Sequence, residues 1–153
     1  LTRSSDLSFE QGHSDVPVAH RESWSEAAQK RMAAVGELLA AKGLAKAMGD
    51  VQAPLFNAPA VAFFTMPRNA GSWAMLDMGG FYQTFMLALT AEGYGSIPAY
   101  AFVKFPEVVS KYLPITDDEQ IVVGVGFGKP SDAPINSLRE ARPEMDSILS
   151  IKG

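Results

Sequence analysis

Two arginines near the C-terminal end, Arg139 and Arg142, have the residue type and spacing to bind a ligand directly. Residues three apart on a helical turn share a face, so both guanidinium groups could grip one phosphate. Charge-assisted hydrogen bonds of this kind contribute roughly 1.5–3 kcal/mol each. Glu140 and Glu144 are equally available as partners, and a solvated or salt-bridged pair is the commoner arrangement. Taken alone, the pair favours that second interpretation.

A second pattern that could bind a phosphate group is formed by three glycines, Gly124, Gly126 and Gly128. The dinucleotide fingerprint needs G-x-G-x-x-G at the opening of a helix, so that the helix N-terminus meets the pyrophosphate. Here Lys129 and Pro130 follow, and then a polar loop. We therefore interpret the glycines as part of a strand onto which another element packs closely.

No nucleophile–base pair is visible in the sequence. His13 and His20 lie in a polar N-terminal stretch without a carboxylate cluster, which is typical of exposed loop histidines and not of metal ligands. G-x-S-x-G, H-E-x-x-H and Walker lysine motifs are missing. The sequence has no cysteine, which excludes a thiol nucleophile and fits a cytoplasmic location. If the protein is an enzyme, we expect a bound cofactor, without a metal or catalytic side chain, to carry the chemistry.

Length and charge narrow the class of protein. The chain has 153 residues, enough for one domain (1–153) with a real core. A net charge of −4 argues against nucleic acid as a partner, because nucleic acid binds to a basic face. Apolar runs are too short and too interrupted to span a membrane. Because the sequence begins at Leu1 and not at methionine, we expect its N-terminal part to be incomplete.

The stretch 72–101 is the element around which the rest is organised. Its middle, 81–91, is apolar almost all the way round, which predicts a helix that is either the central core helix or a subunit interface. Gly79-Gly80 would admit another backbone, and Gly93 is expected to end the helix. Residues 95–99 are predicted to form a turn of small residues that could hold a flat ligand or simply connect two elements.

The remaining elements are predicted from caps, periodicity and short apolar runs. They are a helix opened by the capping box Ser23-Trp24-Ser25-Glu26 and ending near Gly43, a further helical turn or two to Met48, a strand over 60–65, a loop over 67–71, a short helix over 106–113 and a strong strand over 121–127. The tail, 131–153, has too little apolar material to build a core alone. We therefore expect it to lie along the domain or along a partner subunit.

The order of these motifs resembles the later two-thirds of the FMN-dependent nitroreductase family. The resemblance covers roughly 53–149 and rests on five motifs in sequence: N-A-P before an apolar strand, D-M-G-G opening an apolar helix, AEGYGSIPAYAFVKFP, KYLPI followed by IVVGVGFGKP, and PINSLREARPEMDSIL. It implies an α+β fold, an α/β/α sandwich with a mainly antiparallel sheet. It also implies a homodimer with two FMN sites in the subunit interface, and a tail that adds a strand to the partner's sheet.

Site residues follow from the resemblance position by position. Pro98, Ala99, Tyr100 and Ala101 match the segment that passes the flavin ring, where a backbone N–H points at flavin N5. Many relatives carry Glu-Gly where this chain has Tyr100-Ala101, a change that keeps the backbone donor. Arg142 matches a residue that binds the FMN phosphate, and Arg139 is expected to assist. Trp73, Tyr100 and Phe102 are candidates to line the substrate slot, although they could equally belong to the core.

Two segments of the family pattern have no match in this chain. An Arg-x-Ser-x-Arg segment, which holds phosphate and ribityl groups, and an Asn-x-Gln-Pro-Trp segment near the flavin would both lie upstream of Leu1. They carry about half of the family's FMN contacts. We therefore expect the 153-residue chain on its own to bind FMN weakly or not at all.

The resemblance implies an oxidoreductase that passes hydride from NADH or NADPH to FMN and then to a nitroaromatic or quinone acceptor, in a ping-pong sequence. Two alternatives stay open. One is a family member with another flavin task, such as dehalogenation, which product analysis would distinguish. The other is a truncated, flavin-free dimer built on the helix at 81–89 and without activity, which would be colourless and indifferent to added FMN.

Overall fold

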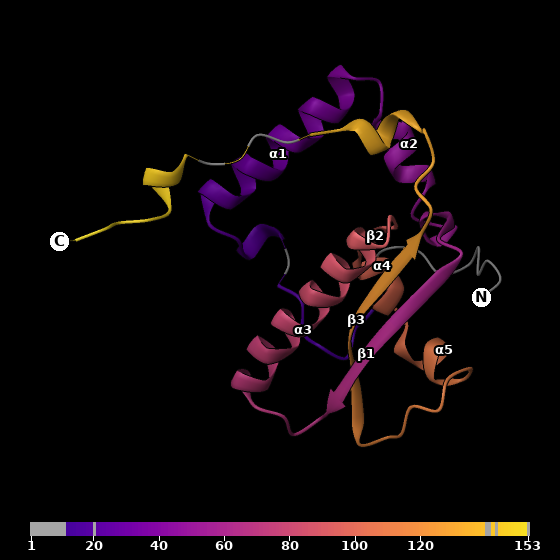
Figure 1. Ribbon diagram of the computed structural model, residues 1–153. Coiled ribbons are helices and arrows are strands. Elements are labelled where there is room, and N and C mark those ends of the chain that lie inside the picture. Colours follow the sequence, from indigo (N-terminus) through magenta and orange to yellow (C-terminus); the bar gives the residue numbers. More distant parts are fainter. Residues whose placement is uncertain (1–11, 20, 140–141, 143, 153) are drawn as a thin grey trace.

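The computed structural model describes residues 12–19, 21–139, 142 and 144–152. The predictions for His20 and Glu140 lie outside these ranges. The described helices and strands follow one another in this order (Figure 1): 3-10 helix η2 (Arg21–Ser23), α1 (Glu26–Ala41), α2 (Ala45–Asp50), η3 (Leu55–Asn57), β1 (Ala60–Pro67), α3 (Ser72–Ala91), β2 (Gly95–Pro98), α4 (Tyr100–Val103), α5 (Pro106–Ser110), β3 (Glu119–Gly128), η4 (Pro134–Ser137) and η5 (Met145–Ser147).

The three strands form one antiparallel sheet in the order β1-β3-β2. The central strand β3 is rich in β-branched residues and pairs along its whole length with β1, from Ala60 opposite Phe127 to Pro67 opposite Glu119. A register shift between Phe64 and Thr65 marks a bulge. The short strand β2 pairs only with the last four residues of β3, so the earlier part of that edge of β3 is not covered by β2.

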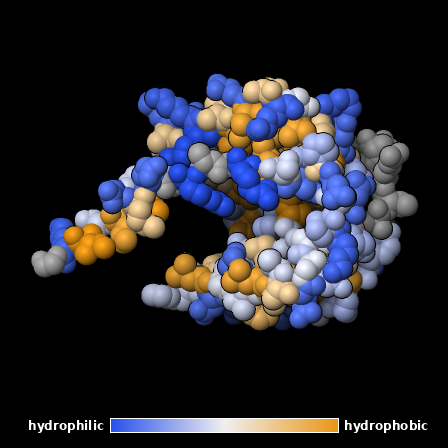
Figure 2. Space-filling model, turned by 45° about the horizontal axis from the view of Figure 1, so that its top comes forward, coloured by the Kyte–Doolittle hydropathy of each residue, from blue (hydrophilic) through white to orange (hydrophobic). Residues whose placement is uncertain are grey.

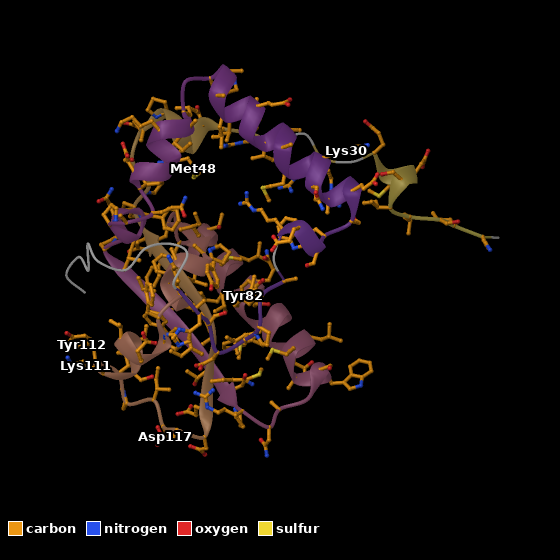
Figure 3. The ribbon with its side chains drawn as sticks, turned by 180° about the vertical axis from the view of Figure 1, so that it is seen from behind. Lys30, Met48, Tyr82, Lys111, Tyr112 and Asp117 are labelled. Atoms are coloured by element: carbon orange, nitrogen blue, oxygen red, sulfur yellow. The ribbon has the colours of Figure 1, made fainter. Side chains whose placement is uncertain are left out.

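Helices cover both faces of the sheet. Successive residues of a strand point to opposite faces, and α3 packs on one face through aromatic rings: Phe85 meets Phe64 and Phe127 edge-on, with ring centroids 5.4 and 5.7 Å apart. The other face carries the core cluster of Phe102, Val103, Val109 and Ile121, contributed by α4, α5 and β3. Figure 3 shows Tyr82 of α3 and Tyr112, just after α5, on opposite sides of the strands. The α+β layers are those that we predicted.

The N-cap of the first long helix lies two residues later than the predicted N-cap, Ser23. Ser25 is the N-cap of α1, and its hydroxyl oxygen accepts a hydrogen bond from the N–H of Ala28 at 3.3 Å. Ser23 instead closes the 3-10 turn η2, where the N–H of Trp24 donates to the carbonyl of Arg21. The prediction of Ser23 as the cap was therefore wrong. The end was predicted correctly, because α1 ends at Ala41 and Gly43 takes a φ of 66°.

The segment after α3 is a strand and not the turn that we expected. Gly95–Pro98 pairs with Val125–Gly128, so its backbone groups find partners in β3. Four residues that include a glycine and a proline carry little strand propensity, and the pairing with a distant strand decides their structure. The other differences are shifts of boundaries: β1 continues to Pro67, and α5 ends at Ser110 instead of 113.

No described residue of α3 is buried in the single chain, despite the apolar composition of this helix. Trp73 is 81% exposed and Leu87 is 60% exposed, and with Leu76 and Gly80 they follow a helical spacing of three, four and seven residues. Helix α3 is therefore not the buried core helix of this chain, and its role as a subunit interface stays a prediction. Although α3 is apolar, no helix in the described ranges is long and hydrophobic enough to cross a bilayer.

Helices α1 and α2 form an arm that stands apart from the sheet, and the C-terminal tail runs beside this arm (Figure 1). Only Leu39 of α1 is buried. Figure 2 shows the result as a hollow between the two parts of the surface, with hydrophobic residues inside it. Lys30 and Met48 mark the arm in Figure 3. The described residues of the arm and the tail are therefore largely exposed in the single chain.

Candidate functional site

The start of α4 is the part of the predicted site that the structure builds most completely. Strand β2 leads into Ala99, whose N–H donates to the carbonyl of Gly124 at 3.3 Å. Helix α4 then begins at Tyr100, and the first N–H groups of a helix have no acceptor within it. In the described part of the chain, the N–H groups of Tyr100 and Ala101 make no hydrogen bond. Two backbone donors are thus available here to an acceptor atom of a ligand.

Phe102 fixes α4 against the sheet. Its side chain is 4% exposed and lies directly over two glycines of β3. A Cβ atom on Gly124 would lie 2.4 Å from Cβ of Phe102, and one on Gly126 would lie 2.5 Å from its Cζ, much closer than real Cβ contacts. The interpretation of these glycines as sites of close packing is confirmed. The structure thus places Phe102 in the core, while Tyr100 stays partly exposed.

Residues 12–18, which we call the strap, cross the edge of β3 that β2 leaves open. Asp15 anchors the strap: its Oδ2 accepts from the N–H of Ile121 at 2.8 Å, and its Oδ1 accepts from Nη1 of Arg68 at 3.1 Å. Nε of Arg68 in turn donates to the carbonyl of Asp117. The Asp15 side chain is only 12% exposed, so this carboxylate is paired with both a charge and a backbone donor.

Replacement of Asp15 by alanine is expected to lower the free energy of unfolding by about 1–3 kcal/mol, because the N–H of Ile121 and the guanidinium of Arg68 lose their acceptor. Urea denaturation measures the change. Asp132→Ala, at an exposed aspartate of the tail, is the matched control and should stay within about 0.5 kcal/mol of the wild type. Equal stability of the two variants would show that the strap is not anchored in this way.

The strap also holds Lys104, the residue that follows α4. The N–H of His13 donates to the carbonyl of Lys104 at 2.9 Å, and a Cβ on Gly12 would lie 2.0 Å from Cγ of the lysine. Burial lowers the pKa of Lys104. Sequence reasoning gave a role to neither Lys104, although it lies within the motif AEGYGSIPAYAFVKFP, nor Asp15, because the partners of both residues are far away in the chain.

A pocket of about 160 Å³ lies between the strap, α4 and β3. We call it the strap pocket. Its walls are formed mainly by aliphatic side chains, from the following residues: Ser14, Val16, Val18, Ala99, Tyr100, Val103, Val122 and Val123. Two of the predicted site residues, Ala99 and Tyr100, therefore line a real concavity.

Trp73 lies away from this site within one chain. It lies in the first turn of α3, whereas β2 and α4 follow the other end of that helix. At 1.5 Å per residue, the 18 residues from Trp73 to Ala91 span about 27 Å. Within one chain, Trp73 is therefore remote from Tyr100 and Phe102.

The two arginines also lie apart from α4. Both are exposed, and Nη1 of Arg139 donates to the carbonyls of Asn136 and Leu138. Leu138, just before Arg139, has an extended backbone with a ψ of 132°; residues 140 and 141 between the two arginines lie outside the described ranges, so the shared helical face stays a prediction. Figure 1 shows the tail beside α1 and α2, away from α4. One chain thus does not bring the arginines to Pro98–Ala101. In the described ranges there is also no cluster of three side chains of the kind that holds a metal.

Comparison with known proteins gives a consistent result. A model of the nitroreductase family matches residues 11–129. The chain is 33% identical over 99 residues to a 4-nitrobenzoate reductase of Pseudomonas putida (64% of this chain, 44% of the relative). It is 32% identical over 123 residues to the nitroreductase NfnB of Mycolicibacterium smegmatis (74% of this chain, 52% of the relative). The chain spans about half the length of the curated relatives it matches.

The fold is similar to a crystal structure of the FMN-dependent nitroreductase NfnB from Mycobacterium smegmatis in complex with NADPH. The TM-score is 0.82 at 27% sequence identity, and the match covers 94% of this chain and 68% of that one.

Proposed function

Since this chain belongs to the nitroreductase family, we propose that the protein is an NAD(P)H-dependent FMN oxidoreductase that reduces nitroaromatic or quinone acceptors. The observation that carries the proposal is the family match over 11–129, which includes the sheet and the start of α4. Two further observations support it: a solved relative of similar fold is FMN-dependent and was crystallised with NADPH, and two relatives are 4-nitrobenzoate reductases.

The geometry at α4 suits a flavin ring. Bound FMN would supply the hydride-accepting atom, N5, so no side chain of this protein needs to act as a nucleophile. The N–H groups of Tyr100 and Ala101 would donate to the flavin, and Phe102 would hold their backbone in place from beneath. Preorganised donors of this kind stabilise developing negative charge without reorganising during the reaction.

The phosphate would be bound by a different part of the protein. Arg139 and Arg142 are exposed cations on a tail that leaves the body of the chain, so they can reach a flavin bound mainly by a second subunit. The apolar face of α3 supports such a dimer, because an exposed patch of this kind marks an interaction surface. We therefore propose a homodimer whose FMN sites combine residues of both chains. The single domain over 1–153 and the cytoplasmic location stay predictions.

Replacement of Arg142 by alanine in the full-length protein is expected to weaken FMN binding by about 10- to 100-fold, the equivalent of one charge-assisted contact to phosphate. Fluorescence titration of FMN measures the dissociation constant. Lys152→Ala removes another exposed cation from the same tail and should leave the constant unchanged. Riboflavin, which lacks the phosphate, should bind both variants and the wild type equally. A similar loss of riboflavin affinity in Arg142→Ala would contradict a phosphate contact.

A further inference from the structure

The turn that joins the arm to β1 has an unusual backbone conformation. Leu55, Phe56 and Asn57 have φ of 52°, 59° and 53°, in the left-handed region where a Cβ atom crowds the backbone and which glycine adopts most easily. None of the three is a glycine, and even a single residue of this kind is uncommon. Such a run persists only where its surroundings determine it, so the turn must be held by contacts outside itself.

The side chain of Phe56 connects this turn to the core at α4. Its ring centroid lies 5.7 Å from that of Phe102, with 46° between the ring planes, a separation at which aromatic pairs attract each other. Leu55 packs against the same core cluster. Phe102 is 4% exposed and lies over Gly124 and Gly126 of β3. The Phe102 side chain is therefore in contact with both the sheet and the turn.

The turn is fixed at both of its ends. On the side of the arm, the N–H of Phe56 donates to the carbonyl of Val51 at 2.6 Å, and the N–H of Val51 donates to the carbonyl of Ala47 in α2 at 3.1 Å. On the side of the sheet, a Cβ on Gly126 would lie 2.9 Å from Cβ of Ala58. Because neither end can shift freely, the left-handed turn sets the position from which the Phe56 ring reaches α4.

We propose that Phe56 is a positioning residue, whose ring fixes Phe102 and thereby the direction of the N–H groups of Tyr100 and Ala101. The N–H of Phe102 donates to the carbonyl of Ala99 at 3.1 Å and closes the first turn of α4 around these two groups, for which the described residues provide no acceptor. A shift of the Phe102 side chain would therefore turn both donors. This inference rests on the proposed function, in which the two groups donate to the flavin ring.

Amide hydrogen exchange, followed by NMR on the full-length protein as purified, tests the contact without nicotinamide or turnover. In Phe56→Leu we expect the Phe102 amide to exchange about 3- to 10-fold faster relative to that of the fully buried Val125, the effect of one lost aromatic pair. Phe56→Tyr keeps the ring and should keep the wild-type ratio. Phe64→Leu removes a ring that contacts α3 on the other face of the sheet, so it should also leave this ratio unchanged.

Fluorescence titration with FMN and with riboflavin then tests the positioning role. Phe56→Leu should raise both dissociation constants by the same factor of about 3 to 10, because the donors face the ring and not the phosphate. Phe56→Tyr and Phe64→Leu should bind both flavins as the wild type does. Thermal melting confirms that each variant is folded.

Three results would overturn the inference and leave the proposed function intact. They are an unchanged Phe102 exchange ratio in folded Phe56→Leu, wild-type affinity of Phe56→Leu for both flavins, and an equal loss in Phe64→Leu. Absence of FMN binding by the full-length wild type would instead overturn the proposed function, and with it the role given to the two donors.

Discussion

Replacement of Gly126 by valine is expected to lower the free energy of unfolding by about 3 kcal/mol or more, the upper range for overpacking a core. A Cβ at this position would lie 2.5 Å from Cζ of Phe102 and 2.9 Å from Cβ of Ala58. Valine favours strands, so the loss would be steric and not one of backbone propensity. Urea denaturation with circular dichroism measures the change.

Gly71→Val is the matched control for this substitution. Gly71 has an extended backbone, with φ of −82° and ψ of 177°, and no atom lies within 4 Å of its built Cβ. Because Gly71 is the N-cap of α3 and its side chain would meet no neighbour, Gly71→Val should lower the free energy of unfolding by less than about 1 kcal/mol. Phe102→Leu removes Cζ, the atom that a Cβ on residue 126 would meet. For the smaller substitution Gly126→Ala, the double variant with Phe102→Leu should therefore lose less free energy of unfolding than the sum of the two single variants. Strict additivity of the two would contradict direct contact between α4 and the glycines.

Replacement of Leu87 by glutamate is expected to raise the dissociation constant of the dimer by at least about 100-fold, or about 2.7 kcal/mol. In a twofold dimer the change occurs twice, and each copy loses the burial of a leucine, about 1.5–3 kcal/mol, and buries a carboxylate. Because we propose that the flavin site is shared between subunits, FMN retention should fall together with the dimer. Sedimentation velocity and the visible spectrum measure both effects.

The control for this experiment is Leu113→Glu. Leu113 is also exposed, but it follows α5 on the opposite face of the sheet from α3. This variant should remain dimeric and keep its flavin. If Leu87→Glu is also a flavin-bound dimer, the apolar face of α3 is not the subunit interface.

The local pattern of the sequence was sufficient to predict β1, α3 and β3, because their apolar runs are long and their ends carry clear signals such as Gly93 with its φ of 73°. It was insufficient for β2, which exists only through its pairing with β3. The N-cap of α1 is Ser25 and not the predicted Ser23, because a 3-10 turn precedes the helix. Both serines carry the same local capping signal, so the sequence alone did not distinguish them.

In the site, too, features that depend on neighbouring residues could be predicted, whereas contacts between residues far apart in the chain could not. The glycine pattern indicated close packing, and the structure identifies Phe102 as the packing residue. The bond between Asp15 and Ile121 joins residues 106 apart in sequence, and no periodicity or motif reports a contact of that length. The arginine pair was expected to share a helical face from its spacing alone; residues 140 and 141 between the two arginines lie outside the described ranges, so this shared face stays a prediction.

One unusual backbone segment also lies outside what propensity predicts. Leu55, Phe56 and Asn57 all have φ between 52° and 59°, a left-handed conformation that disfavours leucine and phenylalanine. The Phe56 ring lies 5.7 Å from the ring of Phe102, so this turn adds a second support beneath α4. Packing against Phe102 offsets part of the conformational cost of the turn.

We propose that the start of α4 belongs to an FMN site that accepts hydride from NAD(P)H. The most direct test is an anaerobic titration of the full-length, FMN-loaded and desalted protein with NADPH and NADH, followed by its visible absorption spectrum. We predict that the flavin band persists after desalting, is bleached by at least one of the two nicotinamides and returns when a nitroaromatic compound is added. A colourless protein after loading and desalting, or a flavin band that neither nicotinamide changes, would contradict a hydride-accepting FMN site at α4.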